Sequence, residues 1–172
     1  MSRRSRLHNS RPTAEDGDRA PALRLDGYLP YRLSTAAGAV SGLIARAYQA
    51  RFDLTIPQWR LMSALAEDGP LAQLQLVSRT VMDKSTVSRA ALGLARRNLV
   101  SRTDRHADGR RRVVALTPSG VGLYAEIAPL ALAYEAALIA GLAPDEVKLL
   151  KRLLCRLQSA ADQLSGAPDQ GG

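Results

Sequence analysis

Apolar residues recur at steps of three and four along most of this chain, which is the periodicity of amphipathic helices. The first such stretch begins at Leu33 and continues to about Phe52. A second opens at Thr55, with Pro57 in the first helical turn, where the missing N–H of proline leaves no hydrogen bond unmade. Gly69 and the proline after it end this stretch. The pattern therefore predicts two helices before residue 70.

The following stretch predicts two short helices joined by a tight turn. Residues 71–79 are expected to form the first helix and residues 80–82 the turn. Asp83 is a suitable N-cap for a helix that continues to Arg97, and Asn98 suits the left-handed position after its end. This arrangement is the helix-turn-helix pattern.

The second of these short helices has two distinct faces. Val87, Ala91 and Leu94 recur at steps of four and three and form an apolar face that can dock on a core. The opposite face carries the polar side chains Lys84, Ser85, Ser88 and Arg89. A helix divided in this way can enter a groove of nucleic acid while its other face stays packed.

A β-hairpin is predicted next to this helix. Residues 99–103 and 112–116 have β-type composition, and the segment between them contains Asp108, Gly109 and Arg110. Gly109 permits the positive dihedral angle that a tight tip needs. The hairpin is therefore expected to project arginines as a wing.

Two further helices are predicted after the hairpin. Thr117-Pro118 repeats the cap-then-proline signal for a helix ending near Gly141, and a last helix begins at Pro144 and runs to about Gln163. The buried stripe expected on the first consists of Val121, Tyr124, Ile127, Ala128, Ala131, Tyr134 and Leu138. The stripe on the last consists of Leu150, Leu153, Leu154, Leu157, Ala161 and Leu164.

The charge is uneven along the 172 residues, a length that suits one compact domain, or one domain with extensions. Lys and Arg exceed Asp and Glu by 24 to 16, and residues 30–112 alone carry fourteen basic and six acidic side chains. Residues 113–172 carry four basic and six acidic ones. A clustered positive surface favours a polyanion, because contact releases condensed counterions. Nucleic acid is the favoured partner, and an acidic membrane surface is the competing one.

Several classes of protein are disfavoured by what the sequence lacks. The single cysteine, Cys155, cannot form an intramolecular disulfide, and there is neither a secretory h-region nor a run of eighteen apolar residues, so a soluble, cytoplasmic protein is expected. His8 and His106 are the only histidines, too few for a closed His/Cys metal site in one subunit. A phosphate loop, a nucleophile elbow and paired catalytic carboxylates are also lacking. We therefore expect no metal, no cofactor and no enzymatic activity.

Four motifs in a fixed order resemble a known family. They are Leu-Thr-Ile-Pro-Gln-Trp-Arg from residue 54, Met-Asp-Lys-Ser-Thr-Val-Ser-Arg from residue 82, Asp-Arg-His-Ala-Asp-Gly-Arg-Arg from residue 104 and Leu-Thr-Pro-Ser-Gly from residue 116. In this order the chain is similar, over about residues 30–164, to the multiple antibiotic resistance regulator (MarR) family of bacterial transcription factors. It departs from the usual pattern at Ala72, a weak cap, at Leu74, an apolar residue where polar ones are common, and at Gly93, which costs roughly 1 kcal/mol in a helix.

The resemblance implies a fold class, a domain division and a function. The fold is mainly α with a small β-hairpin wing: a winged helix-turn-helix with N- and C-terminal dimerisation helices. The division is a flexible basic arm (1–27), an N-terminal dimerisation helix (28–54), the DNA-binding domain (55–116), C-terminal dimerisation helices (117–165) and a disordered tail (166–172). The function implied is a sequence-specific regulator, in the form of a homodimeric repressor released from a pseudo-palindromic operator by a small aromatic effector.

The dimer contacts expected from this arrangement involve the apolar residues of the first and last helices. They are Leu33, Val40, Leu150, Leu153, Leu154, Leu157 and Leu164.

The expected DNA-binding residues lie on the second short helix and on the wing. They are Lys84, Ser85, Thr86, Ser88, Arg89, Arg96, Arg105, Asp108, Arg110, Arg111 and Arg112. Arg89 is the first candidate for guanine O6 and N7, since its forked guanidinium matches these two acceptors, and Lys84 suits the phosphate backbone. Arg110 is placed to enter a narrow minor groove. Asp108 is expected to pair with a nearby arginine and hold the tip in shape.

Other features have two interpretations. Tyr28, Tyr31, Arg32, Tyr48 and Trp59 would line a pocket for an aromatic carboxylate in the family arrangement, or else are ordinary packing residues. The arginines of the arm contact phosphate or a second subunit, or are solvated. Cys155 is an idle thiol or a redox sensor, with no neighbouring feature that lowers its pKa. The basic surface itself would also serve a DNA-binding architectural protein without sequence preference.

Overall fold

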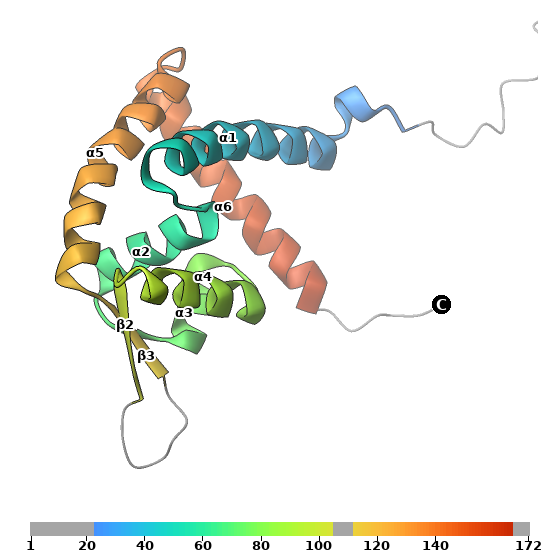
Figure 1. The fold of residues 1–172 in the computed structure, drawn as a ribbon. Coiled ribbons are helices and arrows are strands. Elements are labelled where there is room, and N and C mark those ends of the chain that lie inside the picture. The colour runs from blue at the N-terminus through green and yellow to red at the C-terminus, as the bar shows by residue number, and fades with distance from the viewer. Residues whose placement is uncertain (1–22, 105–111, 167–172) are drawn as a thin grey trace, which may run out of the picture. The chain divides into compact units, whose positions relative to one another are not determined.

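The computed structural model describes residues 23–104 and 112–166 of the chain. Figure 1 shows the elements, in order η1 (Leu25–Gly27), α1 (Leu29–Phe52), α2 (Ile56–Asp68), β1 (Leu71–Ala72), α3 (Gln73–Thr80), α4 (Lys84–Arg96), β2 (Val100–Asp104), β3 (Arg112–Leu116), α5 (Pro118–Ile139) and α6 (Pro144–Gly166). The chain divides into two compact units between Leu43 and Ile44, inside α1, and each unit is described by itself. The predicted mainly α fold with a small β wing is confirmed.

The start of α2 follows the predicted cap-then-proline signal. The Thr55 hydroxyl accepts from the N–H of Gln58 at 3.4 Å, and Gln58 Oε1 accepts from the N–H of Thr55 at 2.9 Å. This reciprocal capping box satisfies two N–H groups that have no partner within the helix. Gly69, with a φ of 78°, ends the helix in a conformation that favours glycine.

The helix-turn-helix is formed by α3, a short turn and α4. Asp83 is the N-cap of α4 and Asn98 has a φ of 55°, so both predicted end signals are confirmed. In the turn, Val81 has a φ of 52° and is 71% exposed. A β-branched residue in the left-handed region is strained, because its Cβ approaches the backbone.

The sheet has three strands rather than the predicted two, in the order β1-β3-β2. The expectation that residues 71–79 are helical throughout is wrong at their start, since Leu71 and Ala72 pair antiparallel with Val114 and Val113. The helix begins only at Gln73. A two-residue strand has no periodicity of its own, so only its pairing with β3 defines it.

The core lies among α2, α3, α4 and the sheet. Val87, Ala91 and Leu94 are buried on the predicted apolar face of α4. They join Leu61, Met62 and Leu65 of α2, Leu76 of α3 and Val114 of β3. This packing leaves the opposite face of α4 toward solvent, and Figure 1 shows β2 and β3 leading away from the helices as the base of the wing.

A close backbone approach joins the sheet to α5. The Thr117 N–H donates to Leu99 O at 3.1 Å and its hydroxyl to Asn98 O at 2.6 Å. Gly120, in the first turn of α5, lies so close that a Cβ added to it would be 2.0 Å from Leu99 O. Only glycine fits at this position.

The helices after the sheet expose most of their apolar side chains. In α5 only Gly120 and Ile127 are buried, so the predicted buried stripe is wrong at Val121 and Leu138, which are exposed because nothing in the described residues covers them. The leucines of α6 are likewise exposed, and Lys151 Nζ forms an ion pair with Glu135 Oε1 of α5 at 2.9 Å. By length and composition, α5 is the one described helix apolar enough to cross a membrane.

Candidate nucleic-acid interface

The exposed face of α4 carries the predicted polar side chains. Lys84, Ser85 and Arg89 are exposed, whereas Thr86 and Ser88 are half-buried. All five lie within the first six residues of the helix, so they occupy its N-terminal end. This is the part of a helix-turn-helix recognition helix that reaches base edges.

Asp83 organises that end of the helix. Its Oδ1 accepts from the Thr86 N–H at 2.8 Å and from the Ser85 hydroxyl at 2.7 Å, and its Oδ2 accepts from the Thr86 hydroxyl at 2.6 Å. The hydroxyls of Thr86 and Ser85 and the Thr86 N–H hold the pKa of the Asp83 carboxyl far below its usual range. The carboxylate is therefore ionised at any physiological pH.

Arg89 is attached to the same network. Its Nη2 donates to Thr86 Oγ1 at 3.3 Å, one turn back along the helix. This single, long hydrogen bond leaves most donors of the guanidinium unused by the described protein. Arg89 can therefore reach acceptors outside the molecule without breaking a buried contact.

The arginines at the end of α4 differ in what they contact. Arg97 donates to Asp53 O at 2.6 Å and to Phe52 O at 2.9 Å. Arg96, its neighbour, is exposed on the last turn, and Arg102 on β2 is half-buried. Both arginines are exposed, but the guanidinium of Arg97 is bonded to two main-chain oxygens of the fold, a difference that no local pattern indicates.

The wing is described only at its base. Strands β2 and β3 pair in register from Val100 with Leu116 to Asp104 with Arg112. The predicted tip residues Arg105, Asp108, Arg110 and Arg111 lie outside the described residues, as does His106, and of Arg112 only the backbone is described. Their assignments remain predictions.

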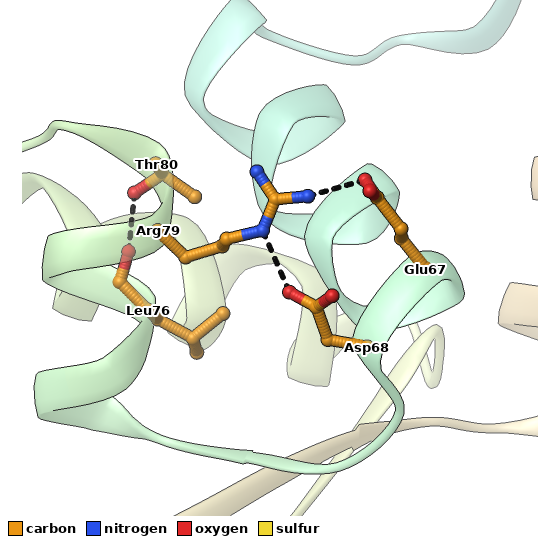
Figure 2. Close-up of polar contacts among 5 residues, drawn as sticks. All are labelled: Glu67, Asp68, Leu76, Arg79 and Thr80. Atoms are coloured by element: carbon orange, nitrogen blue, oxygen red, sulfur yellow. Dashed lines mark hydrogen bonds and ion pairs between the residues drawn. The ribbon is translucent and has the colours of Figure 1, made fainter.

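Two ion pairs of Arg79 join α3 to the end of α2, as Figure 2 shows. Arg79 Nε contacts Asp68 Oδ2 at 2.7 Å and its Nη2 contacts Glu67 Oε2 at 2.5 Å. Beside it the Thr80 hydroxyl donates back to Leu76 O at 2.5 Å. These ion pairs were not predicted, because their only local signal is the Glu67-Asp68 pair at the end of α2.

The predicted pocket residues fall into two groups. Tyr48 is buried and its ring meets Trp59 edge-on at 5.3 Å, while Trp59 stacks on Tyr124 at 5.5 Å. Burial, and to a smaller extent Tyr134, raises the pKa of Tyr48. Tyr28, Tyr31 and Arg32 are exposed and belong to the other unit of the chain. Tyr124 is the member that the sequence analysis did not include.

An open apolar groove of about 700 Å³ lies beside the end of α1. Ala45, Arg46 and Gln49 of α1 form one wall, and Ile56 and Pro57 of α2 form the other. It was not predicted, because residues from two helices create it. Among the described residues that line it, Arg46 is the one with a cationic side chain.

The fold and this interface together define a winged helix-turn-helix protein. The sequence model described as "MarR family" matches residues 52–112. The chain is 31% identical over 108 residues to the transcriptional regulator HosA of Escherichia coli O111:H-, covering 63% of this chain and 80% of HosA. It belongs to the MarR family of transcriptional regulators.

Solved structures agree with this assignment. A MarR family transcriptional regulator from Silicibacter pomeroyi superimposes with a TM-score of 0.69 at 32% identity, over 80% of this chain and 91% of that one. PcaV of Streptomyces coelicolor, solved in complex with its natural ligand, superimposes with a TM-score of 0.70 at 25% identity, over 83% of this chain and 99% of PcaV. The predicted family and fold class are confirmed.

Proposed function

We propose that this regulator is a homodimer that recognises a pseudo-palindromic operator, with α4 in the major groove and the arginine wing in the minor groove. The observation that carries the proposal is the N-terminal end of α4, where Lys84, Ser85 and Arg89 are exposed above a buried apolar face. Hydroxyls and a free guanidinium suit base edges, and an ammonium at the helix start suits phosphate. Arg96 adds positive charge further along the same helix.

The dimer is supported by the apolar surface of α5 and α6. Leu150, Leu153, Leu154 and Leu157 are each 39–44% exposed, and Leu164 is 78% exposed. Soluble monomers rarely expose contiguous apolar patches of this kind. A second copy of the chain would cover them, with Leu33 and Val40 of α1 contributing as predicted. We assign the apolar α5 to this subunit interface, and residues 117–165 to dimerisation.

The wing arginines and the N-terminal arm complete the proposed DNA contacts. Arg105, Arg110, Arg111 and Arg112 would supply minor-groove and phosphate contacts, and Asp108 would hold the tip. We propose the same domain division, with residues 55–116 as the DNA-binding part.

We further propose repression that is relieved by a small aromatic effector. Occupying an operator excludes polymerase by volume alone, whereas activation needs an additional surface for polymerase. The aromatic contacts of Tyr48, Trp59 and Tyr124, and the groove containing Arg46, offer apolar surface and a cation for an aromatic carboxylate. The PcaV complex shows that a relative at 25% identity holds a natural ligand.

The test is competition at fixed salt between the promoter of the protein's own gene and a scrambled duplex of equal length. A specific regulator should prefer its promoter by at least a thousandfold. Arg89→Ala should relax the preference at one base pair in each half-site while leaving the fold intact. Equal displacement by both duplexes would instead identify an architectural protein without sequence preference.

A further inference from the structure

The side chains around Asp83 form a network in which the direction of each hydrogen bond is determined. An ionised carboxylate can only accept, so the hydroxyls of Ser85 and Thr86 must both direct their single proton to it. The Thr86 N–H, at 2.8 Å, occupies the remaining direction of Oδ1. Neither hydroxyl therefore has a proton to offer to any other partner.

Both hydroxyl oxygens still have lone pairs and can therefore accept hydrogen bonds. Ser85 is exposed, so its oxygen is open to solvent. The oxygen of Thr86 already accepts from Arg89 Nη2 at 3.3 Å, which shows that it acts as an acceptor in the free protein. The helix thus presents two acceptor-only oxygens at its N-terminal end, beside the cationic donors Lys84 and Arg89.

Acceptor-only oxygens distinguish between bases in a major groove. The exocyclic amino groups of adenine and cytosine are the only base donors there, whereas guanine O6 and N7, thymine O4 and adenine N7 are acceptors. A hydroxyl oxygen whose proton is already donated to Asp83 gains a hydrogen bond from the amino group of adenine or cytosine. Opposite guanine or thymine it meets another lone pair.

Resting on the proposed function, in which α4 enters the major groove, we propose that Asp83 is a specificity-determining positioning residue. It accepts the hydrogen bonds that the Ser85 and Thr86 hydroxyls donate, and thereby leaves both oxygens able only to accept from the amino groups of adenine or cytosine. Asp83 itself contacts no base in this mechanism. Its effect on sequence preference acts through the two hydroxyls.

Asp83→Asn separates this role from simple helix capping. Asn caps a helix about as well as Asp, so the fold should be preserved. The Thr86 N–H requires an acceptor at the position of Oδ1, which places the amide oxygen there and the amide nitrogen at the position of Oδ2. That nitrogen donates to Thr86 Oγ1, so the Thr86 proton becomes free to donate into the groove.

The experiment is selection of bound duplexes from a randomised library by the full-length protein and by D83N. At the base facing Thr86 the preference of the wild type for adenine or cytosine over guanine or thymine should fall by roughly tenfold in D83N, because the freed Thr86 proton can then bond to an acceptor. The preference at the base facing Ser85 should be unchanged. Thermal denaturation of both proteins checks that the fold is equally stable.

Thr86→Val is the matched control, because it replaces the hydroxyl by a methyl group of similar shape. It should abolish the preference at the same base pair, and D83N combined with T86V should behave as T86V alone. Replacing the selected adenine by purine, which lacks the amino group, should weaken binding by the wild type and not by T86V.

The outcomes distinguish the inference from the function on which it rests. If the wild type enriches no sequence at all, the proposed function fails and the inference fails with it. If the wild type enriches a motif that D83N enriches with unchanged base ratios, the proposed function stands and the inference alone is overturned.

Discussion

The guanidinium of Arg97 at the end of α4 donates to the main-chain oxygen of Asp53, just after α1, at 2.6 Å. Its second nitrogen donates to Phe52 O at 2.9 Å. The last carbonyls of an α-helix have no partner within the helix, so Arg97 satisfies groups that α1 leaves open. The end of the proposed recognition helix is thereby joined to the end of α1.

We expect Arg97→Ala to lower the free energy of unfolding by about 1–2 kcal/mol, because two charge-assisted hydrogen bonds are lost. The neighbouring Arg96→Ala should change stability by less than about 0.5 kcal/mol, since its exposed side chain makes no hydrogen bond to the described residues. Arg96→Ala should instead reduce the slope of log affinity against log salt by about 1. Urea denaturation and DNA titrations at several salt concentrations measure the two effects. Equal stability losses would contradict the different roles of these arginines.

The close contact between α5 and the sheet can be tested with a pair of glycine-to-alanine variants. Gly120→Ala would place a Cβ 2.0 Å from Leu99 O, a backbone atom that cannot move without disturbing the strand. We expect a loss of about 3 kcal/mol or more. Gly122→Ala, where a Cβ meets nothing within 4 Å in the described residues, should gain about 1 kcal/mol of helix stability. Similar melting temperatures for both variants would contradict this close approach.

Replacing Val81, in the turn before α4, by glycine should stabilise the protein. Its φ of 52° is strained for a β-branched residue, and at 71% exposure it loses little buried area when truncated. Val81→Gly is expected to raise the free energy of unfolding by about 1 kcal/mol, measured by urea denaturation. Val81→Ala keeps a Cβ and should recover much less. A destabilised V81G would show that the turn does not have this conformation.

The cap of α4 should contribute pH-dependent stability. The folded-state pKa of Asp83 is depressed by the hydroxyls of Thr86 and Ser85, so its contribution is complete above the unfolded pKa of about 3.9. It is lost as the pH falls below that value toward the folded pKa. The difference in melting temperature between wild type and Asp83→Ala should therefore be largest near neutrality and shrink below about pH 4. A difference that grows on acidification would have the wrong sign.

The leucines of α6 should decide the oligomeric state. Leu153→Glu places a charge on the exposed apolar face and should weaken a dimer by roughly thirtyfold or more. Gln158→Glu adds the same charge to the helix at a position that is already polar and exposed, and should leave the dimer intact. Sedimentation equilibrium measures both variants. An L153E protein that sediments as the wild type would exclude this face from the interface.

Local signals in the sequence were sufficient to predict most of the helices and strands and the exposed polar face of α4. The caps at Thr55, Asp83 and Thr117 act on N–H groups three residues away, so they can be identified without knowing the rest of the fold. Periodicity likewise placed Val87 and Leu94 inward and left the polar side chains of α4 outward. These features depend only on the geometry of one helix.

The tertiary structure alone decided the features that depend on distant parts of the chain. Strand β1 exists because Leu71 meets Val114, and Arg97 is a structural residue because it meets Asp53, 44 positions earlier. Arg96 and Arg97 look alike in sequence and are both exposed, and the packing of α4 decides that Arg97 bonds to the end of α1. The sequence by itself thus determined the helices, their caps and the family of this protein. The tertiary structure decided which charged groups are used within the fold, because such contacts depend on packing between elements and not on the order of residues within one.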